Sequence, residues 1–174
     1  NLEDARNRPV APKFFLDKVE NTASTTTELK KLRNKALSEL QKLFDKTPNK
    51  LFLVAKVVDI NSAQYKKSTP NDVVYDNMDK FINGESVEKN KKKTAEQFLE
   101  AARLDAETLK IRALVKDATY YRFIATKPDG FIYHMATGTA LGKTPLAVIE
   151  YLKNPLNQEI LIELMDKVEK MWNE

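Results

Sequence analysis

The residues with the clearest potential for chemistry stand in the segment ATGTALGKTP, residues 136–145. Its Gly-Lys-Thr ending is that of a phosphate-binding loop, in which backbone amides and a lysine surround a phosphate. That pattern needs a glycine five residues before Gly142, but Thr137 stands there and Gly138 comes one residue too late. The proline that ends the segment also removes an amide donor from the next helix. We therefore expect a linker that leads into a helix capped by Thr144.

Catalytic and metal-binding patterns are otherwise sparse. The chain has no cysteine and a single histidine, His134. No further ligands accompany it at metal-binding spacing, and the GxSxG nucleophile pattern is missing. By strand alternation His134 shares a face with Ile132 and Ala136, and we interpret it as a surface or half-buried structural residue. We expect no metal and no cofactor, and the sequence leans against an enzyme.

The charge of the chain is local. The four lysines of residues 89–93 equal the whole net charge of +4. A surface that attracts a polyanion must therefore be confined to a small part of the molecule. No run of about 18 apolar residues is present, so we expect no membrane partner. The lack of cysteine fits a reducing compartment, and we expect a cytoplasmic protein.

The hydrophobic periodicity predicts a mainly α protein of the α+β class, a helical domain with one β-hairpin near residues 119–137. Two prolines near the N-terminus predict an irregular arm over residues 1–22, followed by one helical domain over 23–174. Three Thr-Pro pairs, which begin at Thr47, Thr69 and Thr144, predict helix starts.

The predicted hairpin consists of the aromatic, β-branched runs TYYRFIAT and FIYHMAT, joined by the turn sequence KPDG. Five of its side chains are aromatic, and with Arg122 and Lys127 nearby they could stack on bases; they are Tyr120, Tyr121, Phe123, Phe131 and Tyr133. Packing of one face against the helices explains the same residues, and we favour that second interpretation.

The segment TAEQFLEAARLDAETLKIRAL, residues 94–114, resembles a helix-turn-helix. In this comparison Phe98 and Leu99 form the apolar pair of the first helix, and Asp105 caps the second helix. With a helix upstream and the hairpin downstream, residues 70–137 resemble a winged helix-turn-helix nucleic-acid-binding domain. Two ordinary core helices joined by a tight corner would give the same pattern.

The resemblance implies that the second helix enters the major groove of DNA. Its basic residues would then contact phosphates and guanine edges, and Glu107 would accept a hydrogen bond from a cytosine amine. The lysine run, which precedes the first helix, would contact the phosphate backbone of the nucleic acid. The tip of the hairpin would act as the wing. The candidate nucleic-acid-binding residues are Lys89, Lys91, Lys92, Lys93, Glu107, Lys110, Arg112, Lys116 and Lys127.

Two functions from different classes follow. The first is a non-enzymatic nucleic-acid-binding protein that uses residues 89–127. The alternative is an assembly or adaptor protein, whose amphipathic helices 25–44 and 155–172 bind protein partners or a second copy. Convergence of the candidate basic residues on one face favours the first function. Scattering of these residues, together with an exposed apolar stripe, favours the second.

Overall fold

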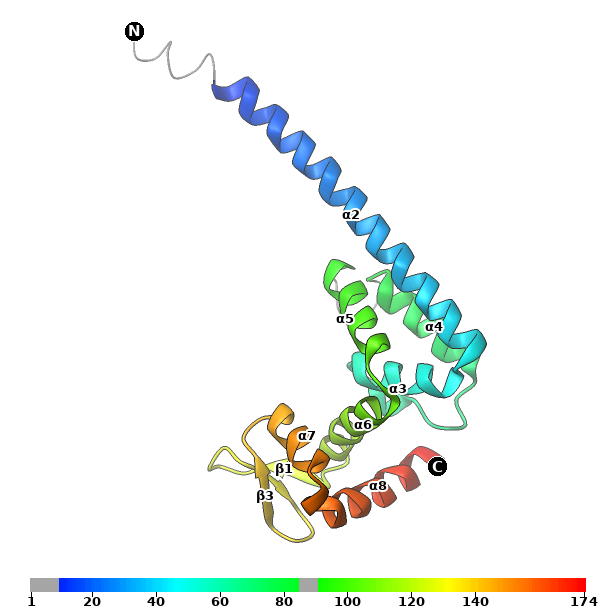
Figure 1. Cartoon of the computed structure of the whole chain (residues 1–174), viewed down its shortest axis with the longest axis vertical. Coiled ribbons are helices and arrows are strands. Elements are labelled where there is room, and N and C mark those ends of the chain that lie inside the picture. The colour runs from blue at the N-terminus through cyan, green and yellow to red at the C-terminus, as the bar shows by residue number, and fades with distance from the viewer. Residues whose placement is uncertain (1–9, 85–90) are drawn as a thin grey trace.

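The structure is a computed structural model that describes the backbone of residues 10–84 and 91–174, and the side chains of residues 26–84 and 93–174. Within these residues the chain forms helices and one small antiparallel sheet (Figure 1), which confirms the predicted mainly α class with a β-hairpin. No described helix has the length and apolar character needed to span a membrane. The elements are α2 (Val10–Lys46), α3 (Pro48–Val58), η1 (Ser62–Gln64), α4 (Asn71–Ile82), α5 (Lys91–Arg103), α6 (Ala106–Tyr120), β1 (Ile124–Thr126), β2 (Ile132–His134), β3 (Thr139–Gly142), α7 (Pro145–Lys153), η2 (Pro155–Asn157) and α8 (Gln158–Asn173).

Helix α2 corrects the prediction of an irregular N-terminal arm. Residues 10–22 are helical, while residues 1–9 lie outside the described part of the chain. Pro12 sits in the first turn of α2, where a missing N–H breaks no intrahelical hydrogen bond. The N-terminal part of α2 extends beyond the other helices (Figure 1). Its C-terminal part buries Ala36, Leu40 and Leu43 among α3, α4 and α5.

Two clusters of buried side chains form the core. The first lies among α2, α3, α4 and α5, and the second lies among α6, α7, α8 and the sheet. Helix α3 packs against both clusters through Phe52, Leu53 and Val57. Helix α6 joins them as well, because Leu109 belongs to the first cluster and Leu114 to the second. Helices α3 and α6 are therefore central, and the elements around them hold the sites described below.

The sheet differs from the predicted hairpin at both ends. Thr119 and Tyr120 belong to the last turn of α6, and β1 begins only at Ile124. At the other end a third strand, β3, pairs with β2 in the segment that was expected to be a linker. Gly138, whose φ is 71°, closes the turn between these strands, and its N–H donates to the carbonyl of His134 at 2.8 Å.

The three Thr-Pro pairs all precede helices, but they do so in different ways. Thr144 caps α7 as predicted, since its Oγ1 accepts a hydrogen bond from the Ala147 amide at 3.1 Å. Thr47 precedes α3 without a side-chain cap. Thr69 accepts from the Lys66 amide instead, and α4 begins after the proline that follows.

Candidate binding site at the end of helix α6

Helices α5 and α6 form the tight corner that the sequence predicts. Asp105 caps α6 through a hydrogen bond from the Thr108 amide to Oδ2 at 3.1 Å. Hydrogen bonds from Thr108 hold the pKa of this carboxyl below its usual value. Helix α6 exposes side chains only at its ends, at Ala106 and Glu107 and at Thr119 and Tyr120. Its middle is buried or half-buried among α3, α7 and α8, so no exposed face runs along it.

The predicted basic residues of α6 lie on two sides of the helix. Lys110 and Arg112 stand about 200° apart around the helix axis, because an α-helix has about 3.6 residues per turn. Lys110 therefore reaches α8, where its Nζ lies 2.8 Å from a carboxylate oxygen of Glu169. Arg112 points to the other side, toward α3 and α5. Lys116, one helical turn after Arg112, lies on that same side and donates to backbone carbonyls at the end of α3.

The remaining candidates lie elsewhere. Lys127 is exposed in the turn between β1 and β2, and its Nζ lies 4.3 Å from the centroid of the Tyr133 ring. Lys93 is exposed in the first turn of α5. Lys89 falls outside the described residues, as do the side chains of Lys91 and Lys92. The described candidates thus occupy several separate parts of the molecule.

A fully buried ion pair joins four elements beside this site. Lys56 Nζ of α3 lies 2.6 Å from Asp117 Oδ2 of α6. Asp117 also accepts hydrogen bonds from the Ser62 hydroxyl of η1 at 2.9 Å and from the Trp172 indole of α8 at 2.6 Å. Burial lowers the pKa of Lys56, and Asp117 opposes that shift. Sequence analysis missed this pair, although a lysine inside the apolar run LFLVAKVV was a sign of it.

Two further lysines hold helix ends together. Lys116 Nζ donates to the carbonyls of Val57, at 3.2 Å, and Asp59 at the C-terminal end of α3. Lys66 Nζ donates to the carbonyl of Met171 near the end of α8, at 2.7 Å, and to the Tyr121 hydroxyl at 3.1 Å. Helix C-termini carry unpaired carbonyls and partial negative charge, which cations stabilise. Each ammonium has three N–H groups and uses two of them here.

A pocket of about 660 Å³ opens between η1 and the end of α6. Tyr120 stands at this pocket with 67% of its surface exposed, and its ring meets the Tyr121 ring edge-on, with centroids 5.1 Å apart. Burial lowers the pKa of Lys116, while Asp59 opposes the shift. The polar and aromatic residues that line the pocket are Asn61, Ser62, Gln64, Lys66, Lys116, Thr119, Tyr120 and Tyr121. The sequence had named Tyr120 and Tyr121 among five hairpin aromatics and Lys116 among the duplex-binding candidates, but it did not predict that they converge with Lys66.

His134 is fully buried, which corrects the expectation of a surface or half-buried residue. Its Nδ1 lies 2.7 Å from the Thr137 hydroxyl, and its Nε2 lies 3.0 Å from Glu163 Oε2 of α8. A hydrogen bond from Lys167, with a smaller contribution from His134, holds the pKa of Glu163 below its usual value. The contact of Nε2 with Glu163 is close in distance but lacks hydrogen-bond geometry, and it places the sheet beside α8. Within the described residues no group of three histidine, aspartate or glutamate side chains is placed to hold a metal.

Comparison of the chain with protein families, with curated proteins and with solved structures finds no match. The resemblance of residues 70–137 to a winged helix-turn-helix therefore rests on the sequence pattern alone.

Proposed function

We propose that the protein binds nucleic acid without catalysing a reaction, and that it holds a single strand in the pocket between η1 and the end of α6. One observation carries this proposal: the exposed ring of Tyr120 shares the pocket with the ammonium groups of Lys66 and Lys116. Proteins that hold single strands combine aromatic rings, on which bases stack, with basic groups that contact phosphates.

The pocket offers a group for each part of a nucleotide. The exposed Tyr120 ring supplies a stacking surface, and its edge contact with Tyr121 limits how that ring turns. The unused N–H of Lys116 is available to a phosphate oxygen. The amide of Asn61 supplies a donor and an acceptor for a base edge. A volume of about 660 Å³ is within the usual range of ligand sites.

A single strand fits this arrangement better than a duplex. Helix α6 exposes only its two ends, and a helix that reads a major groove needs an exposed face. Basic side chains scattered over separate surfaces also cannot follow one duplex backbone. Two phosphate contacts on a single strand predict a shallow salt dependence, with a slope of about −1.4 for log K against log salt concentration.

Fluorescence anisotropy with labelled single-stranded and duplex oligonucleotides at two salt concentrations tests this function. We expect Tyr120→Ala to weaken single-strand binding about tenfold, because stacking on one aromatic ring contributes about 1–3 kcal/mol. Tyr133→Ala is the matched control. Its ring also lies beside a lysine, Lys127, but at the hairpin turn, so the loss of this ring should leave binding unchanged.

Two outcomes would contradict the proposal. A preference for duplex that survives Tyr120→Ala would favour the winged helix-turn-helix arrangement instead. If neither oligonucleotide bound at low salt, the protein would not have a nucleic-acid-binding function. The adaptor function would then be preferred at the same pocket, because Ile60 is 62% exposed there beside Tyr120, and tyrosine is frequent in protein interfaces.

The helices expected to bind partners in that adaptor function bury most of their described apolar residues within the core. In α2 these residues include Leu40 and Leu43, and in α8 they include Leu164 and Trp172. Two large apolar residues of the segment 155–172 are exposed instead, Leu156 of η2 at 89% and Ile162 of α8 at 55%. A protein partner would therefore find exposed apolar side chains at two places, at Ile60 and Tyr120 and at Leu156 and Ile162.

A further inference from the structure

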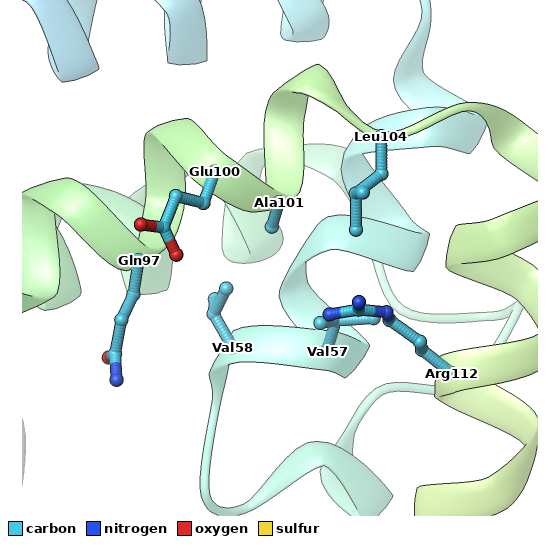
Figure 2. Close-up of a pocket in the computed structure, with 7 residues that line it drawn as sticks. All are labelled: Val57, Val58, Gln97, Glu100, Ala101, Leu104 and Arg112. Carbon is cyan, nitrogen blue, oxygen red and sulfur yellow. The ribbon is translucent and has the colours of Figure 1, made fainter. Parts of the chain in front are cut away.

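Arg112 reaches from α6 into a second pocket, of about 320 Å³, between α3 and α5 (Figure 2). Its Nε is buried and has no hydrogen-bond partner among the described residues. The other two basic residues of α6 are both partnered, Lys110 by Glu169 and Lys116 by backbone carbonyls. A buried donor without an acceptor carries a desolvation cost and calls for an explanation, such as a bound group.

The surroundings of Arg112 define the chemistry of that group. A guanidinium binds a carboxylate through two parallel hydrogen bonds, one of which can come from Nε. Val57 and Val58 of α3, with Ala101 and Leu104 at the end of α5, form an apolar wall that fits a short hydrocarbon chain. The pocket volume is near the lower limit of small-molecule sites, so the ligand must be small.

Glu100 narrows the choice of anion. Figure 2 shows that Gln97 and Glu100 lie across the pocket from the Arg112 guanidinium, with Val58 between the two sides. The carboxylate of Glu100 adds negative charge there, and it disfavours a phosphate or an acid with several carboxylates. A ligand with one carboxylate avoids this repulsion, because its uncharged end faces Glu100.

We propose that this pocket binds an aliphatic monocarboxylate, whose carboxylate pairs with Arg112 and whose hydrocarbon chain contacts Val57, Val58 and Leu104. The same chemistry is present in a free short-chain acid and in the C-terminal residue of a peptide that ends in leucine. No residue lines both this pocket and the one at Tyr120, so the inference stands apart from the proposed nucleic-acid function.

Nuclear magnetic resonance of the isotopically labelled full chain tests this site, since the Nε–H groups of arginines give resolved signals. The probes are 4-methylpentanoate, its uncharged amide, and a short peptide ending in leucine with a free or an amidated C-terminus. We expect the Arg112 Nε–H signal to shift and saturate with at least one free carboxylate, and with neither amide. Saturation by the acid alone would identify the ligand of the pocket as a free acid. Saturation by the peptide alone would identify it as the C-terminus of a peptide chain.

Variants separate binding from folding. Because Arg112→Gln and Arg112→Lys lack the Nε–H group, their binding is followed through the backbone amide signals of Val57, Val58 and Leu104, which line the pocket. Arg112→Gln should weaken binding at least tenfold while the dispersed amide spectrum of the folded chain persists, because the buried Nε of Arg112 has no hydrogen-bond partner to lose among the described residues. Arg112→Lys retains the positive charge but loses the planar guanidinium that donates two parallel hydrogen bonds, so it should also weaken binding. Arg103→Gln changes an exposed arginine of α5 outside the pocket and should bind as the unchanged chain does. Absence of saturable binding, an equal response to acids and amides, or full binding by Arg112→Gln would overturn the proposal.

Discussion

Lys56 and Asp117 show how one pair of residues sets the arrangement of several helices. Both side chains are fully buried, and Asp117 also accepts from Ser62 and Trp172. A buried ion pair costs desolvation energy, so it adds little stability over an apolar pair of the same shape. Removing one partner is different, because the charge that remains has no compensation. The pair therefore stabilises the particular way in which α3, η1, α6 and α8 meet.

At the residue scale, we expect Lys56→Met to lower the free energy of unfolding by about 3–5 kcal/mol, since it leaves Asp117 buried beside an apolar chain. Urea unfolding followed by far-ultraviolet circular dichroism measures this change. Lys50→Met, on the same helix but only half-buried, should change the free energy by less than about 0.5 kcal/mol. Equal effects of the two substitutions would show that the pair has no special role.

Elements that look alike in sequence differ in how they begin. Thr47 and Thr144 each precede a proline at the start of a helix, and both match the usual cap pattern. Only Thr144 accepts a hydrogen bond from the first turn of its helix. The cap depends on the conformation of the preceding chain, which is extended before α7, where Thr144 follows strand β3.

At the element scale, Thr144→Ala should lower the free energy of unfolding by about 1 kcal/mol, the usual effect of losing a side-chain cap. Thr47→Ala is the matched control. It removes the same atoms at a helix start without a cap hydrogen bond, so we expect a change below about 0.5 kcal/mol. Urea unfolding of both variants decides the question, and a larger loss for Thr47→Ala would be inconsistent with the observed caps.

Strand β3 lies in the segment that was interpreted as a linker, and two glycines shape it through local contacts. Gly138 closes the turn before it with a φ of 71°. Gly142 ends it beside α7, where a side chain at this position would lie 2.7 Å from Ala147 Cβ. These glycines therefore serve a turn and a close helix–strand contact, and the resemblance of the segment to a phosphate loop has a structural explanation.

The molecule as a whole contains two clusters of buried side chains that share α3 and α6. Phe52, Leu53 and Val57 pack against both clusters, and α6 contributes buried residues to each. The Lys56–Asp117 pair lies between the same two helices. This sharing predicts that the two clusters unfold together, which agrees with the expectation of one domain over residues 23–174.

At the scale of the whole molecule, we expect substitutions in either cluster to shift one common unfolding transition. Leu40→Ala in the first cluster and Leu164→Ala in the second should each lower the free energy of unfolding by about 2–5 kcal/mol. Trp172 fluorescence in urea is the measurement, because this tryptophan, the single one in the chain, lies in the second cluster. If Leu40→Ala left the Trp172 transition unshifted, the clusters would be independent units.

The sequence by itself determined the features that depend on residues close together in the chain. These are the mainly α class, the turn after β1, the corner between α5 and α6 with Asp105 as cap, and the cap at Thr144. Hydrophobic periodicity and capping patterns act over a few residues, so they are visible without a structure.

Only the tertiary structure decided which charged side chains have partners. Lys56 and Asp117 are 61 positions apart in the sequence, and Lys116 and the Val57 carbonyl to which it donates are 59 positions apart. The pocket at Tyr120, the unpartnered Nε of Arg112 and the burial of His134 likewise depend on which helices pack together. A helical pattern shows that one face is apolar, but the neighbour that covers the rest of the helix is chosen by the packing of the whole chain.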